Sequence, residues 1–202
     1  AGSLSPALKD FVFGVKAPAP CRFFCGRDME LDALHEMLCS QGKVFLQGIA
    51  GIGKSELAKA YAKRYSREYT NIIYFTYSGD LKRDIANLDF ADDVDDNETM
   101  DARFSRHHRL LRRLRDDSLL IIDNFNTVTT RDSLLDVVLN YHCRIIFTTR
   151  SKFDNYASVN LEEIADTETL ISLMGCDSTP MRKNSALFWN RSSRPFTVTL
   201  WL

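Results

Sequence analysis

One glycine-rich segment constrains the fold of this chain more than any other part of its sequence. It matches the pattern G-x-x-x-x-G-K-[ST] and reads Gly48-Ile49-Ala50-Gly51-Ile52-Gly53-Lys54-Ser55. An apolar run precedes this loop, and a helical pattern follows it, marked by Leu57, Ala58, Tyr61, Ala62 and Tyr65. A strand, a glycine loop and a helix in this order are typical of a loop whose backbone N–H groups bind phosphate. The alternative, a plain glycine turn, is disfavoured by this setting.

The last residues of the loop supply the charge and the hydroxyl that phosphate binding needs. Lys54 is expected to reach the β- and γ-phosphates as a point charge, and the hydroxyl of Ser55 to ligate Mg²⁺. Glu56 follows directly and is included in the expected nucleotide-binding set. The segment therefore predicts binding of a nucleoside triphosphate, ATP with Mg²⁺.

Four short apolar runs recur at intervals long enough for a helix between each pair. They are Val44 to Leu46, Ile72 to Phe75, Leu119 to Ile122, and Ile145 to Phe147. Strands that alternate with helices form parallel sheets, so the pattern predicts an α/β fold. Two further helices are expected. One follows Asp28 as its N-cap and stops at Gly42, and the other carries Phe104, Leu110, Leu111 and Leu114.

The third apolar run ends in a carboxylate that is expected to act with the loop. Asp123 follows Leu119-Leu120-Ile121-Ile122, and a phosphate loop needs an acid at the end of a buried strand to hold the metal's water shell. An aspartate that only starts a turn is the alternative. Asn124 stands where many ATPases carry a second acid, and an amide cannot accept a proton from the attacking water. Hydrolysis is therefore expected to be slow.

Arginines mark two further places. Arg150 follows the fourth apolar run, at the carboxyl edge of the sheet where α/β folds bind ligands, and is expected to sense the γ-phosphate; a surface salt bridge is the alternative. One expected helix is basic, with Arg103, Arg106, Arg109, Arg112, Arg113 and Arg115. Nucleic-acid contact is the less favoured interpretation of this helix, because charged outer faces are common and an acidic stretch precedes it.

Composition removes several other classes of function. The 26 basic and 27 acidic residues balance, so the whole-chain charge favours neither a nucleic acid nor an anionic membrane as main partner. The five cysteines are scattered without paired CxxC motifs, which disfavours zinc. No apolar run approaches the ~20 residues of a membrane span. No signal peptide is apparent either, so a cytoplasmic location is expected.

In ordered combination these motifs resemble the NB-ARC domain of the STAND class of P-loop ATPases. The matching segments are Phe24-Cys25-Gly26-Arg27, Gly48 to Ser55, Leu119 to Asp123, and Thr148-Thr149-Arg150. The resemblance implies a P-loop NTPase three-layer sandwich with parallel sheet order 5-1-4-3-2, the fifth strand lying at Ser158 to Leu161. It also implies adenine recognition near Phe24 and Arg27, and catalytic roles for Asp123 and Arg150.

Three segments are expected along the chain: an N-terminal segment and linker over 1–20, the nucleotide-binding domain over 21–175, and an unassigned tail over 176–202. The family continues into a helical subdomain with a Gly-Leu-Pro-Leu-like motif, whereas this tail shows little periodicity. Truncation or a frameshift is the hypothesis for this departure, which gene sequencing would test.

Proteins of this family act as signalling switches that are closed with ADP and competent for assembly with ATP. The resemblance therefore implies an ATP/ADP-dependent switch with slow Mg²⁺-dependent hydrolysis, whose protein partners or self-assembly involve regions outside this chain. Two alternatives stay open: an AAA+-like DNA-associated ATPase, and a scaffold that binds nucleotide without hydrolysing it.

Overall fold

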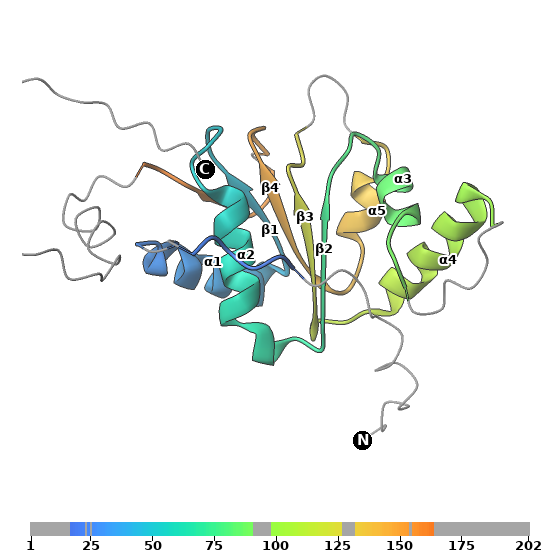
Figure 1. Ribbon diagram of the computed structural model, residues 1–202, viewed down its shortest axis with the longest axis horizontal. Helices are drawn as coiled ribbons and strands as arrows, with labels where there is room; N and C mark the ends of the chain where they lie inside the picture. Colours follow the sequence, from blue (N-terminus) through green and yellow to red (C-terminus); the bar gives the residue numbers. More distant parts are fainter. Residues whose placement is uncertain are drawn as a thin grey trace, which may run out of the picture. The chain divides into compact units, whose positions relative to one another are not determined.

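Five parallel strands form the sheet at the centre of the computed structural model (Figure 1). They are β1 (Lys43–Gln47), β2 (Asn71–Thr76), β3 (Ser118–Asp123), β4 (Arg144–Thr149) and β5 (Ser158–Asn160). Their order, β2-β3-β4-β1-β5, confirms the predicted α/β fold and the order 5-1-4-3-2. All six residues of β3 are buried, as expected for a central strand covered on both faces.

The description covers residues 17–22, 24, 26–90, 98–126, 132–153 and 155–163. The tail over 176–202 and the domain end near 175 lie outside it, so those two boundaries stay predictions. Residues 17–20 form neither helix nor strand, and Ala17 packs against the core. Within the described residues, no helix is long and apolar enough to cross a membrane.

The register of the strands gathers their last residues at one edge. Gln47 of β1 pairs with Thr149 of β4, and Thr76 of β2 pairs with Asp123 of β3. The glycine loop follows Gln47 directly. The carboxyl ends of four strands therefore bring the loop, Asp123 and Thr149 to the same edge, where open α/β sheets bind ligands.

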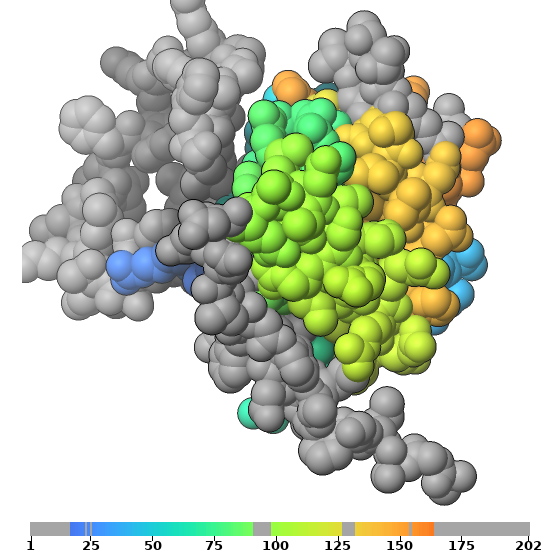
Figure 2. All heavy atoms as spheres, turned by 90° about the vertical axis from the view of Figure 1, so that its right-hand side faces the viewer, coloured from blue at the N-terminus to red at the C-terminus, as the bar shows by residue number. Residues whose placement is uncertain are grey.

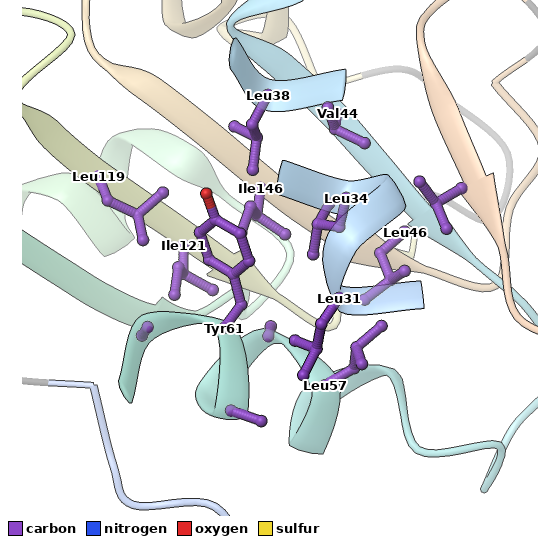
Figure 3. Packing of buried hydrophobic residues seen from close by; sticks show 14 of the residues in the cluster. Leu31, Leu34, Leu38, Val44, Leu46, Leu57, Tyr61, Leu119, Ile121 and Ile146 are labelled. Atoms are coloured by element: carbon purple, nitrogen blue, oxygen red, sulfur yellow. The ribbon is translucent and has the colours of Figure 1, made fainter. Parts of the chain in front are cut away.

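Helices α1 (Asp28–Gln41) and α2 (Lys54–Arg64) cover one face of the sheet. The apolar spacing of α1 buries Leu31, Leu34 and Leu38, and α2 adds Leu57 and Tyr61. Figure 3 shows the Tyr61 ring among side chains of α1 and of the strands, including Leu119, Ile121 and Ile146. This packing fixes the start of α2, and with it the glycine loop, against the sheet.

Helices α3 (Leu81–Ala86), α4 (Met100–Arg113) and α5 (Leu135–Leu139) cover the opposite face. Figure 2 views the molecule from that side, with α4 in light green across its middle. Beneath the helices, the rings of Phe45 and Phe147 stack with centroids 4.5 Å apart, a geometry worth about 0.5–1.5 kcal/mol beyond simple burial. The sheet thus has helical layers on both faces, as predicted.

The ends of α1 agree with prediction at one terminus only. Gly42 adopts the left-handed conformation at φ 73° and closes the helix with an N–H bond to the Leu38 carbonyl, as expected of a glycine C-cap. The predicted N-cap, Asp28, was wrong because it is the first helical residue. Arg27 holds the cap position, and its side chain makes no capping bond. As an acid in the first turn, Asp28 still suits the positive end of the helix.

Candidate functional site

The glycine loop depends on backbone geometry that only glycine adopts easily. Gly51 and Gly53 have φ values of 78° and 98°, in the left-handed region. At Gly48 the constraint is space, since a Cβ would lie 3.0 Å from Ile52 Cγ2 and 3.1 Å from the Leu161 carbonyl oxygen. The three glycines of the motif therefore have local reasons for their positions.

The ammonium group of Lys54 lies within the curve of the loop. Its Nζ donates to the carbonyl oxygens of Gly48, at 2.8 Å, and of Ile49, at 2.6 Å. Burial lowers the pKa of Lys54, the charge of Arg150 lowers it further, and the charge of Asp123 partly opposes both. The two charged residues of the neighbouring strands are thus close enough to Lys54 to act on it electrostatically.

Asp123 is buried and accepts hydrogen bonds from three hydroxyl groups. Ser55 Oγ donates to Oδ1 at 2.7 Å and Thr148 Oγ1 to the same oxygen at 2.5 Å, while the Tyr74 hydroxyl donates to Oδ2 at 2.6 Å. The predicted pair of Ser55 and Asp123 is therefore in direct contact. Sequence reasoning missed Tyr74 and Thr148 as partners of this carboxylate.

The turn after β3 is tied to the end of β4. Asn124 adopts φ 58°, a left-handed conformation that asparagine tolerates better than most residues. Its N–H donates to Thr148 Oγ1 at 2.8 Å, and its side-chain oxygen accepts from Asn126. Asn126 in turn accepts the N–H of Arg150 at 2.7 Å. The backbone of Arg150 is therefore tied to the same edge as Asp123, and its side chain is exposed.

Arg27 reaches the loop from the start of α1. Its side chain is buried, pairs with Glu30 at 2.5 Å, and places Nη2 3.4 Å from the carbonyl oxygen of Ile52. Phe24 is half-buried and packs against the α1–α2 side of the core. The structure thus brings Arg27 to the loop, while the observed contacts of Phe24 are with the core.

Glu56 faces the segment that precedes α1. Its carboxylate accepts the N–H of Cys21 at 2.5 Å and pairs with Lys59 at 2.7 Å. Burial alone would raise the pKa of Glu56, but the hydrogen bonds from Lys59 and Cys21 outweigh that effect and lower it. The bond to Cys21 therefore ties the segment before α1 to α2.

The donor set at this edge suits a hard cation. Ser55 gives its only hydrogen to Asp123, which leaves the lone pairs of Oγ free, and both side chains offer oxygen, the ligand that Mg²⁺ prefers. Among the described residues, no three His, Cys, Asp or Glu side chains cluster as a metal site. These residues therefore fit a metal held jointly by protein and phosphate, not an all-protein cage.

Comparison with known proteins identifies a family over most of the chain. The model of the NB-ARC domain family matches residues 27–171. A search of curated proteins found no match.

Three solved structures have a similar fold. Orc1 of Aeropyrum pernix in complex with DNA has a TM-score of 0.53 at 16% identity, over 76% of this chain and 49% of that one. DnaA of Aquifex aeolicus with bound AMPPCP scores 0.52 at 16% identity, over 79% and 55%. A Walker-type ATPase of Pyrococcus abyssi scores 0.50 at 15% identity, over 79% and 59%. This chain thus spans about half the length of these structures, and at such identities the likeness concerns the fold.

Proposed function

The chain belongs to the NB-ARC domain family, and on that premise we propose that it is an adenine-nucleotide-binding switch domain with slow Mg²⁺-dependent ATP hydrolysis. The observation that carries the proposal is the convergence of a phosphate loop, its Lys54 and a Ser55–Asp123 pair at one edge of a parallel sheet. Each of these groups has a role toward a triphosphate that its chemistry explains.

Backbone N–H groups of the loop and the N-terminus of α2 would receive the β-phosphate. Lys54 would exchange its bonds to the Gly48 and Ile49 carbonyls for phosphate oxygens, since a charged donor bonds more strongly to an anion than to a neutral carbonyl. Phe24 and Arg27, at the entrance to α1, are proposed to contact the adenine side of the nucleotide.

Ser55 and Asp123 would hold Mg²⁺, whose charge would offset that of the β- and γ-phosphates. Ser55 would bind directly through Oγ, and Asp123 would orient both Ser55 and the metal's water shell. Arg150, exposed just after the end of β4, would contact the γ-phosphate, so that the site would distinguish ATP from ADP.

Slow hydrolysis follows from the residue after Asp123. Asn124 is an amide, and its oxygen already accepts a hydrogen bond from Asn126, so it supplies no base for an attacking water. A site that binds ATP well and turns it over slowly suits a switch whose state depends on which nucleotide is bound. Protein partners or self-assembly through regions outside this chain complete the proposal.

A DNA-associated ATPase is the second candidate, and the outer face of α4 is the observation that favours it. Arg109, Arg112 and Arg113 are exposed on that helix, and basic side chains gathered on one face bind nucleic-acid phosphates. Arg106, on the same helix, forms an ion pair with Glu98 at 2.6 Å and is not counted in this basic face.

Single-turnover hydrolysis of ATP, with and without duplex DNA, tests the proposal. We expect Mg²⁺-dependent turnover that is slow and insensitive to DNA. Strong stimulation by DNA would favour the second candidate, and no turnover under any condition would reduce the domain to a nucleotide-binding scaffold.

A further inference from the structure

Tyr74 reaches the proposed metal site from β2, which β3 and β4 separate from the strand that precedes the phosphate loop. It lies on β2 opposite Ile121 of β3, two residues before the strand ends, and its side chain is only 7% exposed. Its hydroxyl donates to Asp123 Oδ2 at 2.6 Å. The Tyr74 side chain is therefore buried, and its hydroxyl contacts the carboxylate at the carboxyl edge of the sheet.

The two oxygens of Asp123 have different sets of partners. Oδ1 accepts from Ser55 and from Thr148, whose own Oγ1 also accepts the N–H of Asn124. A carboxylate oxygen offers about two lone pairs, so Oδ1 is fully used. Oδ2 accepts from the hydroxyl of Tyr74.

The χ2 torsion of an aspartate has broad minima, so contacts must select its orientation. A change in χ2 moves both oxygens of the carboxylate. The bonds from Ser55 and Thr148 restrain this rotation at Oδ1, and the bond from Tyr74 adds an independent restraint at Oδ2.

We propose that Tyr74 is a positioning residue for Mg²⁺: it fixes the plane of the Asp123 carboxylate so that Oδ1 faces Ser55 and the carboxylate faces the metal's water shell. Tyr74 acts through Asp123 and touches neither nucleotide nor metal. This role rests on the proposed nucleotide-binding function and adds β2 to the elements that determine metal affinity. A core tyrosine that merely satisfies its hydroxyl would affect stability and leave metal affinity unchanged.

Tyr74→Phe removes the hydroxyl and keeps the ring, so it separates these two roles. A fluorescent ATP analogue is titrated against the full chain at increasing free Mg²⁺ and again in EDTA. We expect the Mg²⁺ midpoint to rise roughly tenfold, the scale of losing a group that orients a metal ligand. Affinity in EDTA should equal that of the wild type. Mn²⁺ binding to the ADP complex, followed by electron paramagnetic resonance, should weaken in parallel.

Tyr69→Phe is the matched control, because Tyr69 is also buried and its hydroxyl bonds to Tyr61 and Arg144, away from Asp123. Its Mg²⁺ midpoint should equal that of the wild type. Thermal unfolding without ligands establishes that each variant is folded. Tyr74→Met, which also lacks a hydroxyl, replaces Tyr74→Phe if that variant does not fold.

The outcomes separate this role from the proposed function. A wild type that binds no nucleotide in EDTA or in Mg²⁺ would overturn the proposed function itself. A wild type that binds with a clear Mg²⁺ dependence, beside a Tyr74→Phe variant with the same or a lower midpoint, would overturn only the role of Tyr74. In an Asp123→Asn background, Tyr74→Phe should change the midpoint no further, since the two residues act as one unit.

Discussion

Ser55 Oγ lies 2.7 Å from Asp123 Oδ1, although 68 positions separate the two residues in sequence. The contact joins the first turn of α2 to the last residue of β3, across the intervening strand β4. It exists because parallel strands bring their carboxyl ends to one edge, where the phosphate loop also begins.

Removal of either partner should abolish most of the effect of Mg²⁺ on nucleotide binding. For Ser55→Ala and Asp123→Asn we expect near-wild-type affinity in EDTA, and at least about a tenfold loss of the affinity gained on adding Mg²⁺. Isothermal titration with ADP measures both quantities. Asp117→Asn is the control, since Asp117 directly precedes β3 at its opposite end and is exposed. A full Mg²⁺ gain in Asp123→Asn would contradict the metal assignment.

Arg150→Met should weaken ATP binding by about tenfold and leave ADP binding nearly unchanged, because only ATP carries the γ-phosphate that the guanidinium is proposed to contact. Competition titrations of the two nucleotides measure the ratio of affinities. Arg144→Met serves as the control, since Arg144 begins the same strand at its other end and bonds to Tyr69. Equal losses for ATP and ADP would show that Arg150 does not sense the third phosphate.

Asn124→Asp should speed single-turnover hydrolysis by about tenfold or more, because a carboxylate there can accept the proton of the attacking water. Aspartate also tolerates the left-handed backbone at this position, so the fold should persist. Asn124→Gly keeps that backbone without adding a base and should not gain rate. An unchanged rate in Asn124→Asp would mean that another step limits hydrolysis.

The thiols of Cys39 and Cys143 should differ sharply in reactivity. Cys39 is exposed on α1, whereas Cys143 is buried, and burial raises the pKa of Cys143 to about 12. Iodoacetamide at pH 8 followed by peptide mass analysis should find Cys39 modified and Cys143 protected until denaturant is added. Rapid modification of Cys143 in the native state would contradict its burial, just before β4.

The same shift predicts a loss of stability in alkali. A thiol whose pKa is higher in the folded state stabilises the fold fully below its unfolded pKa of about 8.5. That contribution is lost as pH rises from there toward about 12. The free energy of unfolding, measured with denaturant, should fall less between pH 8 and pH 10 in Cys143→Ala than in the wild type. Identical decreases in the two proteins would exclude Cys143 as a source of the alkaline loss of stability.

The sheet was predictable from sequence because its strands are short apolar runs with helix-length gaps, and the order followed from the family resemblance. Two helices were not identified individually. α3 and α5 span only six and five residues, too few for a periodic pattern, although Asp80 caps α3 through the N–H groups of Lys82 and Arg83. Asp28 is an acid just before the periodic leucines of α1. Such a position is typical both of an N-cap and of the first helical turn, so the sequence does not distinguish the two.

The site was predictable where chemistry concentrates in a motif and obscure where it depends on register. Lys54, Ser55 and Asp123 stand out by residue type and context. Tyr74 sits in the run Asn71–Thr76, where a tyrosine resembles any other core residue. Its place opposite Ile121 in the strand register brings its hydroxyl within hydrogen-bond distance of Asp123, two residues further along β3. Spatial neighbours of this kind leave no signal in a single sequence.

Titration of labelled ATP against the wild type and Lys54→Ala tests nucleotide binding by the phosphate loop most directly. Lys54 is the cation within the curve of the loop, so its loss should weaken binding by at least about tenfold. Lys63→Ala, an exposed change near the end of the same helix, should bind as the wild type does. Equal affinity in Lys54→Ala and the wild type would contradict the assignment of the loop as the nucleotide site.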